Sequence, residues 1–143
     1  MLNTLSQLLV GAAVIFACVV VQAALVAVAF ARLRRLKRNA SDHVSILRVS
    51  LVVGAMALWL MVVHATAIGA WAVTFGMVGV FSDWDTSVYF SAVAFTTLGF
   101  GDVLLPDRWR QLAGLCAAHG LLVFGVSSAA LVEVFRQALD PKA

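Results

Sequence analysis

The chain has 143 residues, of which 63% are hydrophobic and 12% charged, and its mean hydropathy is +1.01. A soluble domain of this length could not cover so much apolar surface, so the composition excludes a soluble globular protein and predicts a single integral membrane domain. The net charge of +3 is no sign of nucleic-acid binding, because the basic residues cluster at one edge of an apolar run. Cys18 and Cys116 both lie in apolar runs, which is typical of small buried hydrophobes and supports neither a disulfide nor a metal pair.

Residues 1–31 carry no charged side chain and predict a first transmembrane helix from about Leu5 to Ala31, too long for the apolar core of a secretory signal. We expect it to be a peripheral helix, and without repeated Arg or Lys it does not resemble a voltage sensor. Residues 32–43 follow as a predicted basic loop. Its five basic side chains are Arg32, Arg34, Arg35, Lys37 and Arg38. By the positive-inside rule this loop is cytoplasmic, which places the N-terminus outside and the short tail, residues 137–143, in the cytoplasm.

The second apolar run, residues 44–81, is longer than one span of ~20 residues. It predicts a tilted helix from about Val44 to Val73, followed by a looser exit through Gly76 and Gly79. A further transmembrane helix is predicted at residues 111–136.

Between these two helices, residues 85–96 predict a helix too short to cross ~30 Å of hydrocarbon. Such a segment must be re-entrant, entering from outside as a helix and returning as extended chain. Asp83 or Asp85 is the expected N-cap of this helix. Three aromatic side chains fall at the predicted outer interface: Trp84, Tyr89 and Trp109.

The segment after the short helix, residues 97–102, contains helix-breaking glycines at membrane depth. Irregular backbone is tolerated there only when it is buried in protein or lines a water-filled path. Gly99 and Gly101 reach backbone angles that are closed to other residues, and their alternation with Leu98 and Phe100 lets successive carbonyls face one axis. Rings of such carbonyls from several chains can replace the hydration shell of a cation.

The residues "TTLGFGD", Thr96 to Asp102, resemble the signature of the potassium-channel pore loop, whose commonest form reads T-x-G-Y-G-D. The longer stretch "YFSAVAFTTLGFGDVLLPDRWRQL", followed by "HGLLVFG", is similar to small bacterial two-transmembrane potassium channels, here with an extra N-terminal helix. The resemblance covers the predicted pore domain, residues 44–136. It implies an all-α homotetramer in the cell inner membrane. Potassium ions would bind in a selectivity filter, residues 97–102, and no other cofactor is expected. Its expected partners are copies of itself, monovalent cations and membrane lipid, with no nucleic acid.

The resemblance also implies the residues of the site. The carbonyls expected to bind the cation, with no side-chain metal site, are those of Thr97, Leu98, Gly99, Phe100 and Gly101. Asp102 is expected at the outer mouth, where a carboxylate raises the local cation concentration. Helical spacing predicts a cavity-lining face on the inner helix, formed by Ala117, Leu121, Phe124, Ser128 and Val132. Gly120 and Gly125 are either bending points or sites of close helix packing.

The sequence departs from the family pattern around the filter. Phe100 replaces the usual tyrosine, and Tyr89 and Phe90 stand where many members have two tryptophans. We therefore expect a filter wall held by packing more than by hydrogen bonds, with Phe100 packed against the short helix. Val93 stands where some members carry a carboxylate, so Asp102 is expected to lack such a partner.

Several charged or polar residues admit a structural interpretation. His64 and His119 are expected to be neutral, hydrogen-bonded core groups at similar depth, one of them contacting the short helix. Glu133 is expected to pair with Arg136 or Arg48. Three charged side chains follow the filter: Asp107, Arg108 and Arg110. They are interpreted as exposed surface groups, although one of them could contact and position Asp102 of a neighbouring subunit.

Passive conduction of a cation, with potassium preferred, is the function predicted by these observations. The alternatives are a poorly selective cation pore, a non-conducting membrane subunit and a proton-coupled exporter. An exporter needs an acidic residue within a helix, and the predicted spans contain none before Glu133 at an edge. No nucleophile, metal-ligand or nucleotide motif supports an enzyme.

Overall fold

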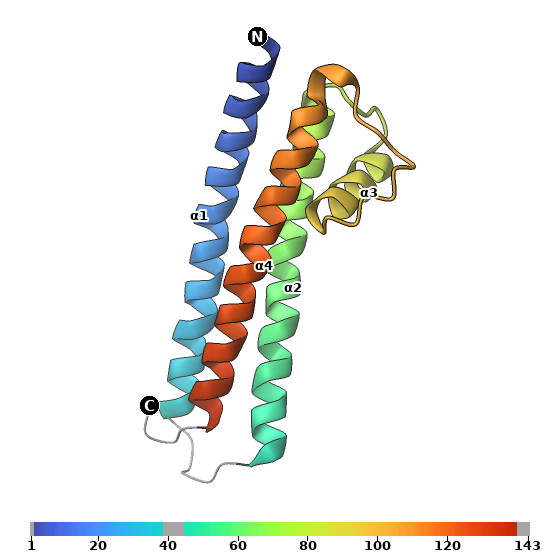
Figure 1. Cartoon of the computed structure of the whole chain (residues 1–143). Helices are drawn as coiled ribbons and strands as arrows, with labels where there is room; N and C mark the ends of the chain where they lie inside the picture. Colours follow the sequence, from blue (N-terminus) through green and yellow to red (C-terminus); the bar gives the residue numbers. More distant parts are fainter. Residues whose placement is uncertain (1, 39–44, 140–143) are drawn as a thin grey trace.

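The computed structural model describes residues 2–38 and 45–139, and this part of the chain is entirely helical and loop. The long helices are α1 (Leu2–Arg38), α2 (Ile46–Met77) and α4 (Arg110–Leu139). Figure 1 shows them side by side, with the short helix α3 (Trp84–Phe95) at the end where the N-terminus lies. A single turn of 3-10 helix, η1 (Asp107–Trp109), leads into α4. The three stretches long and apolar enough to span a membrane are Thr4–Arg35, Ile46–Met77 and Asp107–Leu139.

The basic segment is predicted to be a loop that begins at residue 32, and the structure differs from this prediction. Helix α1 continues through it to Arg38. Arg, Lys and Leu are strong helix formers, so the backbone hydrogen bonding continues past the edge of the apolar run. The rest of the predicted loop, residues 39–43, lies outside the described residues.

Helix α2 also runs further than predicted, ending at Met77 rather than near Val73. Its end is a left-handed cap at Gly79, whose φ is +70°. The backbone N–H of Gly79 donates to the carbonyl of Gly76, and that of Val80 donates to the carbonyl of Phe75, each at 3.0 Å. These bonds satisfy carbonyls that a helix end leaves unpaired. The exit predicted to be loose is therefore a defined turn.

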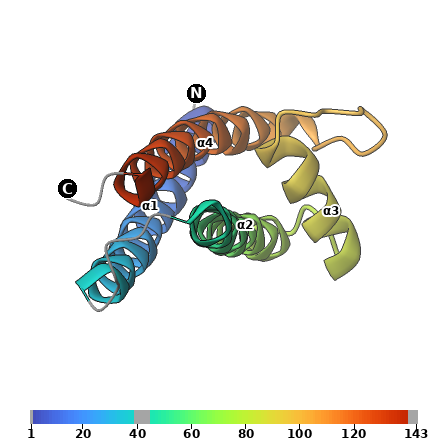
Figure 2. The ribbon, with the colours of Figure 1, turned by 90° about the horizontal axis from the view of Figure 1, so that it is seen from below.

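Helix α1 lies at the edge of the bundle in the single chain and contacts both other long helices. Near its start, the side-chain oxygen of Gln7 accepts a hydrogen bond of 3.0 Å from the backbone N–H of Gln111. Further along, the indole N–H of Trp59 donates to the carbonyl of Leu25 at 3.0 Å. Seen along the bundle in Figure 2, α2 and α4 lie between α1 and α3. The helix outside the predicted pore domain is thus attached on the side away from α3.

The main core lies where α2, α3 and α4 meet. It is built largely of aromatic side chains, and its fully buried members include Trp71, Phe75, Phe95, Leu112 and Cys116. A smaller cluster joins α2 to α4 near the other end, and consists of Met56, Leu60, Ala130 and Val134. The larger core holds the short helix at a set position on α2 and α4.

Candidate functional site

The short helix α3 begins at a capped end. Asp83 accepts hydrogen bonds from both the backbone N–H and the hydroxyl of Thr86, each at 2.8 Å. Of the two N-caps considered, Asp83 is therefore the one used, because its side chain reaches an amide that the helix itself leaves unpaired. The hydrogen bond from the Thr86 amide is the main cause that lowers the pKa of the Asp83 carboxyl.

The other end of α3 forms a left-handed cap on a threonine. The backbone N–H of Thr97 donates to the carbonyl of Ala94, and that of Leu98 to the carbonyl of Val93, each at 3.0 Å. This is the pattern that Gly79 makes on α2, but here the left-handed residue is Thr97, with φ of +60°. A β-branched residue in this region costs about 1–3 kcal/mol and persists only where its surroundings impose it.

Beyond this cap, the backbone alternates in handedness. The φ angles of Thr97, Gly99 and Gly101 are +60°, +57° and +80°, whereas Leu98 and Phe100 have ordinary negative values. In a regular strand, successive carbonyls point to opposite sides. Alternating left- and right-handed residues instead lets them turn to the same side. The sequence predicted unusual backbone angles for the two glycines, and the structure adds a positive φ at Thr97. The position of Thr97 directly after the end of the helix is the signal that could have indicated this conformation.

The alternating segment is uncovered in the single chain. Leu98 is 58% exposed and Phe100 is 65% exposed. A Cβ added at Gly99 or Gly101 would meet no atom within 4 Å, so these glycines are required by their φ angles and not by crowding. Because most of the Phe100 ring is exposed, the packing predicted for it against the short helix is at most partial within one chain.

Asp102, directly after this segment, has a partner that the sequence analysis missed. The hydroxyl of Tyr89 on α3 donates to Asp102 Oδ2 at 2.6 Å. This bond lowers the pKa of the Asp102 carboxyl and raises the pKa of the Tyr89 phenol. The expectation that the filter wall relies mainly on packing is therefore wrong at this position. The chain returns alongside α3, which brings together two residues that are 13 apart in the sequence.

The C-terminal end of α3 packs directly on the inner helix at Gly120. A Cβ at residue 120 would collide with the carbonyl oxygen of Phe95, the last residue of α3. Gly125, the other glycine predicted as a bending point, has no atom within 4 Å of such a Cβ. Close packing thus explains a glycine at 120, and bending at either residue stays a prediction.

Two buried histidines flank the Phe95 ring. The ring centroid of Phe95 lies 5.5 Å from that of His119 and 6.2 Å from that of His64. His119 Nδ1 accepts a hydrogen bond of 3.0 Å from the indole N–H of Trp71, and His64 Nε2 lies 3.0 Å from the hydroxyl of Ser127. Both histidines are hydrogen-bonded core groups, and both contact the short helix where only one was expected to.

Of the predicted cavity residues, Phe124 touches this core: its ring centroid lies 4.6 Å from that of His64 and 5.9 Å from that of Phe95. The predicted cavity face of α4 is open in the single chain, with Leu121 62% and Val132 70% exposed. Phe124 is 38% exposed, Ser128 is exposed, and Ala117 is half-buried. That face stays a prediction, because nothing in the single chain shows what it encloses.

Two ion pairs account for charges near the ends of α4. Glu133 accepts from Arg136 at 2.9 Å, as expected, and also from Gln137 at 2.6 Å. Arg110 pairs with Asp107 at 2.8 Å. Within this chain Arg110 is therefore paired with Asp107, three residues earlier in the sequence.

A family model described as "Ion channel" matches residues 51–137, which is more than half of the chain. The chain belongs to this ion-channel family. The match covers most of α2, all of α3 and the alternating segment, and nearly all of α4, and leaves α1 outside. No curated protein and no solved structure gives a significant match. Membership of the family and the three helices able to span a membrane identify a multi-pass membrane protein.

Proposed function

We propose that this channel protein is a potassium-selective subunit that conducts passively as a homotetramer. The observation that carries the proposal is the alternation of positive and negative φ angles from Thr97 to Gly101. Four copies of this segment around one axis would stack rings of backbone carbonyls, which replace the hydration shell of a cation. The carbonyls that would bind potassium are those of Thr97, Leu98, Gly99, Phe100 and Gly101.

The elements around the segment would favour a cation on both of its sides. Helix α3 ends directly before Thr97, so its dipole places partial negative charge there. On the far side, Asp102 supplies a carboxylate that the bond from Tyr89 keeps charged and oriented. In the tetramer, the open face of α4 with Leu121, Phe124 and Val132 would line the cavity beneath the filter. Each of these features attracts or accommodates a cation, and none requires that the passage of the cation be coupled to a chemical reaction.

The orientation of the chain follows from its basic segment. Arg32, Arg34 and Arg35 extend α1 beyond its apolar run, at the end of the bundle opposite α3. Because such residues stay on the cytoplasmic side, the filter would open to the outside of the cell inner membrane. The N-terminus would then lie outside and the C-terminus in the cytoplasm.

Reconstitution of the full chain in liposomes with opposed potassium and sodium gradients tests the proposal. We expect a barium-sensitive flux whose reversal potential follows potassium. Gly99→Ala should abolish this flux because alanine disfavours a φ of +57°. Gly54→Ala is the matched control, since Gly54 is an exposed helical residue with nothing within 4 Å of an added Cβ. A reversal potential that follows sodium equally would instead identify a poorly selective pore, and a folded protein without flux would identify a non-conducting subunit.

A further inference from the structure

A groove lies between α1 and α2, at the end of the bundle away from α3. Its volume is about 330 Å³, within the usual size of small-ligand sites. The nine lining residues are Val28, Ala29, Arg32, Leu33, Val52, Ala55, Met56, Trp59 and Val134. Eight of them are apolar and one is charged, so any ligand must offer a long apolar part and a group that suits a single cation.

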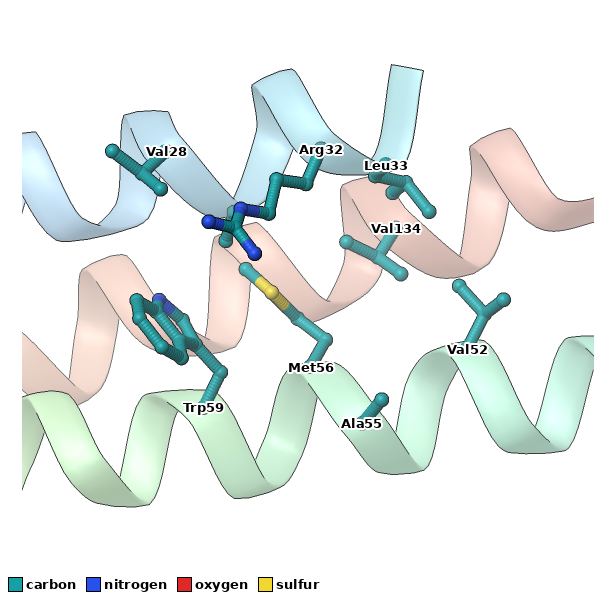
Figure 3. Close-up of a pocket in the computed structure, with 9 residues that line it drawn as sticks. Val28, Arg32, Leu33, Val52, Ala55, Met56, Trp59 and Val134 are labelled. Atoms are coloured by element: carbon teal, nitrogen blue, oxygen red, sulfur yellow. The ribbon is translucent and has the colours of Figure 1, made fainter. Parts of the chain in front are cut away.

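The charged lining residue is placed to meet an anion at the mouth of the groove. Figure 3 shows Arg32 reaching from α1 toward Met56 on α2, with Trp59 further along the same groove. Arg32 and Ala55 are exposed, so the groove opens at the surface of the chain. Among the residues that the structure describes, no carboxylate forms an ion pair with Arg32. With respect to the described residues, its guanidinium is therefore available to a ligand.

The groove is on the outer side of the bundle with respect to the proposed pore. Its floor is Val134, which is fully buried. Val134 follows the predicted cavity residue Val132 by two positions, about 200° around the helix axis. When the cavity face of α4 points to a pore axis, the groove between α1 and α2 points away from it, toward lipid.

We propose that this groove binds an acidic phospholipid from the leaflet that adjoins the basic segment. An acyl chain would fill the apolar part between Val28, Met56 and Trp59, and the headgroup phosphate would bind Arg32. Basic pockets between transmembrane helices recognise such headgroups, and guanidinium groups bind phosphate through paired hydrogen bonds. Helix α1, which lies outside the family match, supplies four of the nine lining residues, and binding of a lipid there does not depend on the conduction proposed above.

Quenching of tryptophan fluorescence by brominated lipid tests this assignment in vesicles that contain the full chain. Trp59 lies in the groove and Trp71 is fully buried. Trp84 is the first residue of α3 and Trp109 the last residue of η1, so both belong to elements at the other end of the bundle. Two vesicle preparations contain the same mole fractions of phosphatidylglycerol and phosphatidylcholine, with bromine on the acyl chains of one lipid or of the other. We expect brominated phosphatidylglycerol to quench more, with a preference of roughly fivefold, the size expected for one interfacial cation.

Variants separate the groove from a general surface effect. Arg32→Ala should remove the preference, whereas Arg35→Ala should keep it, because Arg35 is an exposed residue of the same helix that does not line the groove. Ala55→Phe should also remove it by filling the groove without changing the charge. Trp59→Phe should abolish the preferential signal and so assign it to this tryptophan. Size-exclusion profiles and circular dichroism establish that each variant is folded.

Three outcomes would overturn the assignment. Equal quenching by the two lipids in the unmodified protein would exclude a preference for the acidic headgroup. An equal loss in Arg32→Ala and Arg35→Ala would identify a diffuse surface attraction. Quenching of Trp59 by neither lipid would mean that another protein segment, such as a helix of a neighbouring subunit, covers the groove.

Discussion

The backbone of Gly120 on the inner helix lies directly against the carbonyl oxygen of Phe95, the last residue of the short helix α3. Because backbone meets backbone, neither side can move aside as a flexible side chain would. This contact sets how closely the end of α3 approaches α4.

Replacing Gly120 with alanine should push α3 away from α4. We expect Gly120→Ala to lower the free energy of unfolding by about 1–3 kcal/mol, the usual cost of overpacking, and to reduce potassium flux. Gly125→Ala is the control, because an added Cβ there meets nothing within 4 Å. Unfolding in mixed detergent micelles and liposome flux provide the measurements. A larger loss in Gly125→Ala would favour bending at that residue over packing at Gly120.

Thr97 occupies a left-handed position that suits glycine better, so its replacement should stabilise the fold. We expect Thr97→Gly to raise the free energy of unfolding by about 1 kcal/mol. The neighbouring Thr96 has a φ of −80°, where glycine brings no relief and costs backbone entropy. Thr96→Gly should therefore destabilise. Changes of the same sign in the two variants would contradict the strain assigned to Thr97.

The bond between Tyr89 and Asp102 predicts how the outer mouth responds to acid. The pKa of Asp102 is lowered from its ordinary value of 3.8 by this bond, so its charge survives to lower pH than that of a free carboxyl. The stability that the carboxylate contributes is present above pH 3.8 and is lost as the pH falls through the lowered pKa. Tyr89→Phe removes the donor, and the acid-induced loss of potassium conductance should move to higher pH.

Conductance measured while the pH of the solution on the filter side is lowered checks this expectation. Asp102→Asn is the control, because it has no carboxyl to titrate at this site and should lack the acid step with or without Tyr89→Phe. The phenol gives a second signature at high pH. Its pKa is raised above 10.0, so the stability it contributes is present below pH 10.0 and is lost as the pH rises through the raised pKa. If Tyr89→Phe leaves the pH of the acid-induced loss of conductance unchanged, this loss does not report the titration of a carboxyl that is bonded to Tyr89.

The buried pair of Trp71 and His119 predicts non-additive effects on stability. Replacing His119 with leucine leaves the indole N–H of Trp71 buried without an acceptor, which should cost about 1–3 kcal/mol. Trp71→Phe removes the donor but also leaves a smaller ring in the core. The double variant should cost less than the sum of the single variants, because no unpaired donor remains. Unfolding in mixed micelles measures the four proteins of this cycle, and strict additivity would show that the bond contributes nothing measurable.

Local patterns were sufficient to predict the elements of the site. The apolar runs indicated three spanning helices, and a helix too short to cross the membrane indicated a re-entrant segment. Gly99 and Gly101 indicated the irregular backbone because no other residue type reaches their φ angles at so little cost. The three long helices, the short helix and the positive φ angles of the two glycines are present in the structure, because helix length, hydropathy and glycine conformation are properties of short stretches. That the short helix is re-entrant stays a prediction.

Partners across the fold could not be predicted in the same way. The hydroxyl of Tyr89 reaches Asp102 only because the returning chain runs along α3, and no local pattern in the sequence indicates this pair. The helical form of the basic segment up to Arg38 was also missed, since a cluster of like charges was interpreted as a loop although its residues favour a helix.

The sequence alone indicated the membrane class, the order of the helices and the irregular backbone at Gly99 and Gly101, because hydropathy and glycine conformation depend on short stretches of chain. The tertiary structure decided which side chains contact the short helix α3 and the segment that follows it. Phe95 meets Gly120, His64 and His119 only when α2, α3 and α4 pack together, and Tyr89 meets Asp102 only when the loop turns back. The short "TTLGFGD" stretch thus marks where the site lies, while its support comes from residues distant in the chain that packing brings into contact.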